Sequence, residues 1–523
     1  MFKPNFLFII ADQLPATHLS CYDNPILLTP NIDGLAKSGW RSQNLYVASG
    51  ICMPNRASLM TGRMPSRHGV RHNGIPLSLG ANTFVETLRV HGYRTIITGK
   101  SHLQNMTDQP PQWPVRAEDR AAAQAHQEAK GNYKQESPSF WDSPDQPCMD
   151  LPFYGFTDVA LANGHGDRLH GHYWRWLQTH YPGIAGISGP EHALPTPECK
   201  LSTYRQAWRT RIPQELHPTA WIADKTIHYL QEQVNKTQPF FLYCSFPDPH
   251  HPFTPPGYYW DMYRPDGIEL PETFYRVCRP PPHLAWLRAQ RDAGHAIKST
   301  PGVFAASEKE AREAVALSHG STAHIDFQVG RILDTLKALG LGSNTVIIFT
   351  TDHGDFMGDH QLLWKGPLHY RSVIRSPFIW SDPLHSAQAC NDSLLSTIDI
   401  APTILERAGI PAYNGMQGYS MLPLIKNEAD KIRESVLVEE EGQRIALGFA
   451  NRVRMRTLIT AQHRLSVYDG VEWAEIYDHQ NDPWEYDNLW AQASDKTVRE
   501  LMEQMIRATI TLSETSPYAK NVA

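Results

Sequence analysis

The chain has 523 residues, of which 41% are hydrophobic, and a formal net charge of −6. A chain of this length can bury a large core, and we expect one large domain followed by a smaller one. The acidic balance and the lack of a block of basic residues exclude nucleic acid as an expected partner.

The first apolar run, residues 6–11, is far shorter than the roughly 20 residues that span a bilayer, and no later run reaches that length. Asp12 follows this run directly, without the small-residue cleavage site of a signal peptide. Seven cysteines, an odd number with scattered spacing, do not indicate a disulfide framework. These features predict a cytoplasmic protein that does not associate with a membrane.

Short apolar runs with the pattern of buried strands recur along the chain, each ending in polar residues. They span residues 6–11, 92–99, 239–246 and 345–351. Helical patterns lie between them, at residues 30–38, 220–234 and 323–339. This alternation predicts an α/β domain with a large, mostly parallel central sheet flanked by helices.

The segment that begins at Cys52 has the marks of a helix start. Pro54 suits the first turn of a helix, and Gly62 suits the position just after the last turn. A helix N-terminus attracts anions, and Arg56, one turn beyond Cys52, offers a planar fork for sulfate or phosphate oxygens. From the residues alone, a buried thiol at a loop–helix junction is the alternative. A phosphatase of the Cys-x5-Arg type is excluded, because Ser58 holds the required position.

Polar side chains follow each of the four predicted strands. In chain order they are Asp12 and Gln13, Lys100 and His102, His250 and His251, and Asp352 and His353. Ligands of open parallel sheets bind outside the carboxyl ends of the strands. We therefore expect these side chains to converge on one site.

Residues 52–63, Cys-Met-Pro-Asn-Arg-Ala-Ser-Leu-Met-Thr-Gly-Arg, resemble the signature of the sulfatase family, formylglycine-dependent members of the alkaline phosphatase superfamily. In that family the cysteine is oxidised after translation to formylglycine, an aldehyde whose hydrate is the nucleophile. The resemblance thus implies formylglycine at Cys52 and a maturation enzyme as a partner. Asn55 departs from the small residue that is usual in the family.

Three further segments carry the resemblance. Residues 92–102 are similar to the second sulfatase signature, residues 249–252 to a Pro-His-x-Pro segment, and residues 364–370 to a segment with a sulfate-binding lysine. The catalytic residues that the resemblance implies are Cys52, Arg56, Lys100, His102, His250 and Lys365. Asn73 and His251 are predicted to contact the substrate.

The resemblance also implies a site for one divalent metal ion. Its predicted ligands are Asp12, Gln13, Asp352, His353 and an oxygen of the modified Cys52. The family expectation is Ca²⁺, and the nitrogen ligand of His353 makes Mn²⁺ the alternative. The Asp-Gln and Asp-His pairs resemble the choline-sulfatase and phosphonate monoester hydrolase branches.

The pattern changes after residue 425, which divides the chain into predicted domains at 1–425 and 426–523. Strand candidates at 435–439, 454–460, 463–468 and 474–478 precede a helix from 495 to about 512. They predict a smaller antiparallel sheet with one helix, similar to the C-terminal subdomain of sulfatases. Within the first domain, residues 109–148 and 255–301 are rich in proline and charge, and we expect them to be insertions.

The predicted function is hydrolysis of a sulfate monoester, with a small molecule or a sugar sulfate as substrate. A phosphonate monoester or phosphodiester hydrolase with the same nucleophile is the alternative. A non-catalytic protein that binds an anion or a metal is the third hypothesis. The oligomeric state is left open, and a homo-oligomer is compatible with the sequence.

Overall fold

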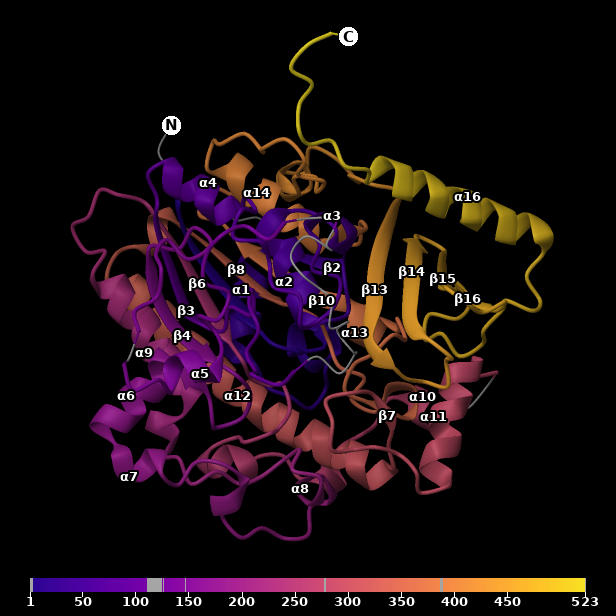
Figure 1. Cartoon of the computed structure of the whole chain (residues 1–523), viewed down its shortest axis with the longest axis horizontal. Coiled ribbons are helices and arrows are strands. Elements are labelled where there is room, and N and C mark those ends of the chain that lie inside the picture. The colour runs from indigo at the N-terminus through magenta and orange to yellow at the C-terminus, as the bar shows by residue number, and fades with distance from the viewer. Residues whose placement is uncertain are drawn as a thin grey trace.

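The computed structural model describes residues 3–110, 125, 127–145, 147–276, 279–385 and 389–522. A large sheet with helices on both faces forms the main body, and a smaller sheet stands beside it under the C-terminal helix (Figure 1). This arrangement confirms the predicted fold class.

The large sheet is mixed, with a parallel centre. Its strands in spatial order are β11 (Ala389–Asn391), β2 (Trp40–Tyr46), β10 (Arg375–Ser381), β8 (Thr345–Thr351), β1 (Asn5–Ala11), β6 (Phe240–Phe246), β3 (Arg94–Gly99), β4 (Asp158–Asn163) and β5 (His170–Gly171), while β12 (Leu395–Ser396) pairs with β2. Strands β8, β1, β6, β3 and β4 are neighbours and run parallel. The four predicted strands are among them, so their carboxyl ends lie along one edge.

The central strand β1 is buried on both faces. Phe6 and Phe8 pack into one hydrophobic cluster, whereas Leu7 and Ile9 pack into another on the opposite face. Successive side chains of a strand point to opposite faces. A strand covered on both sides therefore appears in the sequence as a continuous apolar run, which is why this strand was predictable.

Helices cover the two faces of the sheet. The longer ones are α1 (Pro30–Ser38), α2 (Cys52–Thr61), α4 (Phe84–Val90), α6 (His172–His180), α9 (Pro218–Gln231), α11 (Pro282–Asp292), α12 (Glu308–Ala338), α14 (Ile400–Arg407) and α16 (Asp495–Thr511). Short helices are α3 (Pro65–His68), α5 (Pro138–Trp141), α7 (Pro182–Ala185), α8 (Lys200–Thr203), α10 (Glu272–Tyr275), α13 (Arg371–Ile374) and α15 (Leu422–Ile425). Helices α2, α4 and α14 pack on the Phe8 face, and α1, α6, α9 and α12 pack on the Ile9 face.

Helix α12 is longer than the predicted 323–339. It begins at Glu308, where the Ser307 hydroxyl accepts from the Glu310 backbone N–H and the Glu310 carboxylate accepts from the Ser307 backbone N–H. This reciprocal capping box satisfies two backbone donors at the helix start.

The second sheet is antiparallel, as predicted. It consists of β13 (Ser435–Ile445), β14 (Arg452–Thr460), β15 (His463–Tyr468) and β16 (Ala474–Asp478) in that order. Helix α16 packs Leu501 and Met505 into the core beneath it. The backbone N–H of Glu439 in β13 donates to the carbonyl of Ala48, which connects this sheet to the chain just before α2. The domain division at residue 425 stays a prediction.

The proline-rich intervals differ in how much of them is described. The structure describes residues 255–301 except for 277–278, and this interval contains α10 and α11. The interval 109–148 includes α5, and its residues 111–124, 126 and 146 lie outside the described part.

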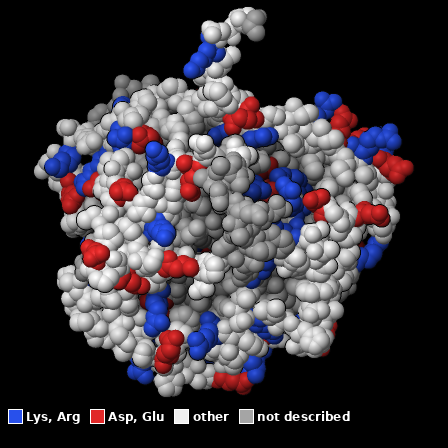
Figure 2. Space-filling view, viewed as in Figure 1, with Lys and Arg blue, Asp and Glu red and all other residues white. Residues whose placement is uncertain are grey.

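No helix of the described residues is long and apolar enough to cross a membrane. On the face shown in Figure 2, acidic and basic side chains are interspersed.

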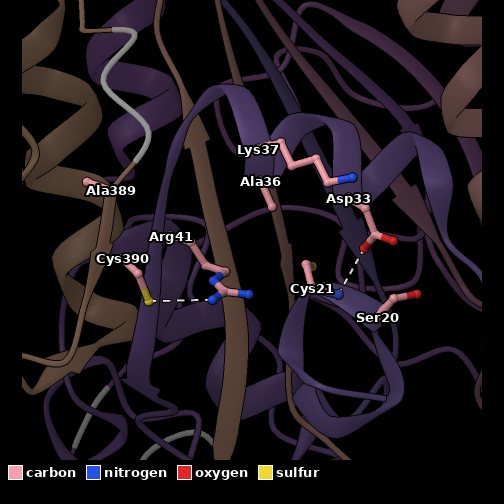
Figure 3. Close-up of a pocket in the computed structure, with 8 residues that line it drawn as sticks. All are labelled: Ser20, Cys21, Asp33, Ala36, Lys37, Arg41, Ala389 and Cys390. Carbon is pink, nitrogen blue, oxygen red and sulfur yellow. Dashed lines mark hydrogen bonds between the residues drawn. The ribbon is translucent and has the colours of Figure 1, made fainter. Parts of the chain in front are cut away.

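A cavity of about 540 Å³ lies at the β2–β11 edge of the large sheet (Figure 3). Arg41 donates a hydrogen bond to Cys390 Sγ at 3.6 Å, and the backbone N–H of Cys21 donates to Asp33 Oδ1 at 2.9 Å. Burial and the Asp33 carboxylate raise the pKa of the Cys21 thiol to about 12, so this thiol stays protonated. The predicted site residues are not among those that line this cavity.

His217 makes the stability of the fold depend on pH. Its Nε2 donates to the Thr254 carbonyl at 3.1 Å, and burial lowers its pKa from 6.5 to about 3. Below about pH 6.5 the His217 imidazole therefore becomes protonated in the unfolded chain but stays neutral in the folded chain. As a result, the free energy of unfolding falls as the pH falls towards 3. At pH 5 we expect this histidine to cost about 2 kcal/mol relative to pH 7. Urea denaturation at pH 7 and pH 5 should show a smaller loss of unfolding free energy for His217→Asn than for the wild type. An equal loss in the two proteins would contradict the assignment of this pH dependence to His217.

Candidate active site

Helix α2 starts at Cys52, as predicted, and all of its residues are buried. It ends at Gly62, whose φ of 62° lies in the left-handed region that glycine tolerates. Asn73 Oδ1 accepts a hydrogen bond from the backbone N–H of Met53 at 3.1 Å, so this side chain satisfies a free donor of the first turn. The prediction that Asn73 contacts the substrate is not tested by this contact.

Asn55, the departure from the family pattern, is also buried in α2. Its Oδ1 accepts from the Ala48 backbone N–H at 2.9 Å and from Thr397 Oγ1 at 2.7 Å, and its Nδ2 donates to the Asp352 carbonyl. A smaller side chain would remove the acceptor of the Thr397 hydroxyl and the donor to the Asp352 carbonyl, whereas the Ala48 N–H would keep Thr397 Oγ1 as an acceptor at 3.0 Å. The amide therefore joins the start of α2 to the end of β8.

Four predicted metal ligands meet at Cys52. Its Sγ lies 3.0 Å from His353 Nε2 and 3.8 Å from Asp12 Oδ1. His353 Nε2 lies 3.7 Å from Asp352 Oδ1 and 3.9 Å from Asp12 Oδ1. Atoms that bind one divalent ion at about 2.2 Å lie about 3 to 4 Å apart, so the four residues fit a single ion. The unmodified thiol stands in for the formylglycine side chain that the resemblance implies.

Arg56 is completely buried between the two carboxylates. Its Nε donates to Asp352 Oδ2 at 2.8 Å, and a terminal nitrogen lies 3.4 Å from Asp12 Oδ2. Burial alone would raise the pKa of Asp12, but Lys100, Arg56 and Lys365 outweigh it and hold that pKa well below its usual value. The Asp12 carboxylate is thereby kept ionised and available as the predicted ligand.

Lys365 Nζ donates in three directions. Its acceptors are Cys52 Sγ at 3.0 Å, His250 Nε2 at 2.8 Å and Gln13 Oε1 at 2.5 Å. Burial lowers the pKa of this ammonium, but the Cys52 and Asp12 charges outweigh burial and the pKa lies above its usual value. A protonated lysine therefore lies beside the Cys52 sulfur.

Gln13 was predicted to be a metal ligand. In the structure its backbone N–H donates to Asp352 Oδ1 at 3.0 Å, while its side-chain oxygen accepts from Lys365. Its amide nitrogen donates to Asp355 and lies 3.2 Å from His251 Nδ1. The ligand role of Gln13 stays a prediction. Asp355 was not among the predicted site residues, although it lies only three positions beyond Asp352.

His165 is a second residue that the sequence did not identify. Its Nε2 accepts from Lys100 Nζ at 2.7 Å, and its ring stacks on His250 with centroids 3.7 Å apart. It follows β4, a fifth parallel strand that is not among the four strands predicted from the sequence. Asp12, His165 and His250 form a further trio of metal-binding types, but the ammonium of Lys100 already contacts two of its members.

His102 and His251 are buried and neutral. Burial, reinforced by Lys100 for His102 and by Lys365 for His251, holds both pKa values well below 6.5. The backbone N–H of His102 donates to Glu136 Oε1 at 2.9 Å, and its Nδ1 has no partner among the described residues. His251 stacks on Trp364 at 3.9 Å. Their predicted roles in catalysis and substrate binding remain predictions.

Residues 4–410 match the sulfatase family, and residues 358–511 match the C-terminal region of N-sulphoglucosamine sulphohydrolases. The chain belongs to the sulfatase family. This confirms the resemblance that the Cys52 segment carries. An arylsulfatase of Clostridium perfringens (strain 13 / Type A) is 27% identical over 459 residues, which cover 83% of this chain and 81% of that protein.

A further relative agrees with this assignment, and a solved structure shares the fold. A choline-sulfatase of Rhizobium meliloti (strain 1021) is 24% identical over 501 residues, covering 93% of this sulfatase-family chain and 82% of that protein. The crystal structure of a phosphonate monoester hydrolase of Agrobacterium radiobacter has the same fold, with a TM-score of 0.76 and 24% identity over 99% of this chain and 98% of that one.

Proposed function

We propose that this member of the sulfatase family hydrolyses a sulfate monoester, with formylglycine derived from Cys52. The observation that carries the proposal is the position of Cys52 at the buried start of α2. There its Sγ lies 3.0 Å from both His353 Nε2 and Lys365 Nζ, between a metal-ligand set and a proton donor. The relatives named for arylsulfate and choline sulfate support an ester of sulfate as the substrate class.

The groups that the family implies fit this site. The aldehyde would supply the attacking oxygen, and the divalent ion would stabilise negative charge as a Lewis acid. Asp12, Asp352 and His353 would hold the ion together with an oxygen of the modified Cys52, and Gln13 is the further predicted ligand. We propose Ca²⁺, with Mn²⁺ as the alternative because His353 offers nitrogen.

The cations of the site are arranged to bind a tetrahedral anion. Lys100 contacts Asp12, Lys365 contacts Cys52, and Arg56 pairs with both carboxylates. These groups would stabilise the charge that develops on the sulfate oxygens, which is where preorganised cations contribute most to catalysis.

The proton for the leaving group would come from Lys365. His250 Nδ1 bonds to the His251 carbonyl and must therefore carry hydrogen, which leaves Nε2 as the acceptor of the Lys365 hydrogen bond. Of Lys365 and His250, Lys365 thus holds the transferable proton, which it would deliver directly or through His250. The neutral imidazole of His102 can act as a base in this reaction.

A test of this acid is Lys365→Met, which keeps an unbranched side chain one atom shorter and removes the ammonium. We expect kcat to fall by about 10² to 10⁴ for alkyl sulfates, because their alkoxide leaving groups need protonation. The loss should be much smaller for a nitrophenyl sulfate, whose leaving group departs as a stable anion. A uniform loss across a leaving-group series would reject the assignment, and the exposed Lys37→Met serves as the control.

The second candidate is a phosphonate monoester or phosphodiester hydrolase. Gln13 and His353 are the observation behind it, because they occupy the two positions through which the sequence resembles both that branch and the choline-sulfatase branch. The distinguishing experiment compares kcat/KM for a sulfate monoester and a phosphonate monoester on purified protein that carries formylglycine. Faster sulfate hydrolysis supports our proposal, faster phosphonate hydrolysis supports the alternative, and no turnover of either supports a non-catalytic binding protein.

A further inference from the structure

Lys365 lies at the end of a strained turn. Met357, His360, Gln361 and Trp364 all have positive φ values, between 47° and 72°, in a region that side chains other than glycine rarely adopt. Asp355 Oδ1 accepts from the backbone N–H groups of Met357 at 2.9 Å and Trp364 at 3.0 Å. One carboxylate oxygen thus joins the beginning of this turn to the residue that precedes Lys365.

The other oxygen of Asp355 accepts a hydrogen bond from Gln13 Nε2. Both residues are completely buried. A carboxylate only accepts hydrogen bonds, so the NH₂ group of Gln13 must face it. The amide oxygen is thereby turned towards Lys365 Nζ, 2.5 Å away. The opposite orientation would place an NH₂ group against an ammonium and a carbonyl oxygen against a carboxylate.

The same orientation determines the tautomer of His251. The second hydrogen of Gln13 Nε2 points to His251 Nδ1 at 3.2 Å, which makes Nδ1 an acceptor. The ring hydrogen must then lie on Nε2, an atom that is buried and without a partner among the described residues. A buried N–H in this position is available to an oxygen of a bound ester.

We propose that Asp355 is a positioning residue that acts through the Gln13 amide to fix both the direction of the Lys365 ammonium and the tautomer of His251. The proposal deepens the function proposed above and rests on it. Lys365 has three hydrogens and three acceptors. Gln13 Oε1 and His250 Nε2 accept two of the ammonium hydrogens, so the third hydrogen points at Cys52 Sγ.

Asp355→Asn tests the proposal with almost no change of shape. Its oxygen keeps the two backbone donors of the turn, so its NH₂ group faces that of Gln13 and forces the amide to reverse. We expect kcat to fall by about 10- to 100-fold, the usual effect of losing a hydrogen bond that orients a reacting group. KM should change less than threefold, because the ammonium acts mainly in the transition state.

A charge-conserving exchange provides the rescue. In Asp355→Asn combined with Gln13→Glu, the amide introduced at position 355 can donate to the new carboxylate, which again offers Lys365 an oxygen. We expect this double variant to recover at least tenfold in kcat over Asp355→Asn. Gln13→Glu alone sets two carboxylates against each other and should be impaired. If the double variant is no better than Asp355→Asn, the proposal is wrong.

Asp359→Asn is the matched control. Asp359 lies in the same turn and accepts from Thr273 Oγ1 at 2.5 Å and Ser372 Oγ at 2.6 Å, away from Lys365. Its kcat should stay within twofold of wild type. An equal loss in the two variants would show that Asp355 merely supports the turn, and would overturn the proposal.

A readout independent of turnover separates this proposal from the proposed function. Nitrogen-15 NMR of histidine-labelled protein, with His251 assigned through His251→Gln, should show hydrogen on Nε2 in wild type and on Nδ1 in Asp355→Asn. An unchanged tautomer overturns the inference even if the wild type hydrolyses sulfate esters. A changed tautomer in a protein that hydrolyses no ester supports the inference while the proposed function fails.

Discussion

Cys52→Ala should abolish ester hydrolysis, with kcat reduced by at least about a thousandfold. The methyl group of alanine offers neither a nucleophile nor a precursor of formylglycine. It also removes the acceptor at the centre of the site, because Cys52 Sγ is the group on which Lys365 Nζ and His353 Nε2 converge. The measurement is kcat on a nitrophenyl sulfate for protein produced in the native host.

Mass spectrometry of the peptide that contains Cys52 completes this test. Formylglycine is lighter than cysteine, since one sulfur and two hydrogens are exchanged for one oxygen. We expect turnover to scale with the modified fraction in wild-type protein. Cys390→Ala is the control, because this exposed thiol lies in the cavity at the sheet edge. Undiminished turnover by fully unmodified protein would contradict the proposed chemistry.

Removal of the metal ion, or of a ligand, should have the second large effect. In Asp352→Asn the site loses one of its two carboxylates, and the new NH₂ group must face either Arg56 Nε or two backbone N–H donors. We expect the bound metal to fall from about one ion per chain to well below one, and kcat/KM to fall by about 10³. Elemental analysis and steady-state kinetics measure the two effects.

Asp382→Asn is a matched control for this variant. Asp382 is also buried and paired with an arginine, through two hydrogen bonds from Arg407 at 2.6 and 3.0 Å. It should lose stability but keep its metal and kcat. Chelation of the wild type, followed by addition of Ca²⁺ or Mn²⁺, identifies the ion. Full activity of metal-free protein would contradict a metal-assisted mechanism.

The predictable parts of the fold were those with a local signal. Residues 30–38 were predicted as a helix and form α1 with the same bounds. Pro30 occupies the first turn of this helix, and Gly39 follows its last residue. The four central strands were identified because both of their faces are buried. Strand β2 was not, since Arg41, Gln43 and Asn44 interrupt its apolar pattern and its place is decided by pairing with β10.

The candidate site shows the same division. Asp12, Lys100, His250 and Asp352 were predicted because each follows the end of an apolar run. His165 and Asp355 were not, although His165 contacts Lys100 and His250, and Asp355 contacts Gln13. His165 meets Lys100 across 65 positions of sequence, and Asp355 meets Gln13 across 342. A hydrogen bond between distant segments leaves no periodic pattern in the chain.

The sequence by itself determined the family, the α/β class and a cysteine at the start of a helix, because these depend on short-range spacing and hydrophobic pattern. Only the tertiary structure decided which atoms of Lys365, Gln13 and His250 face one another. Donors and acceptors acquire a direction only when the strand ends are brought together, and burial then leaves each of them a single way to be satisfied. For this reason the residues that make up the site at Cys52 could be predicted from the sequence, whereas the donor and the acceptor of each hydrogen bond between them could not.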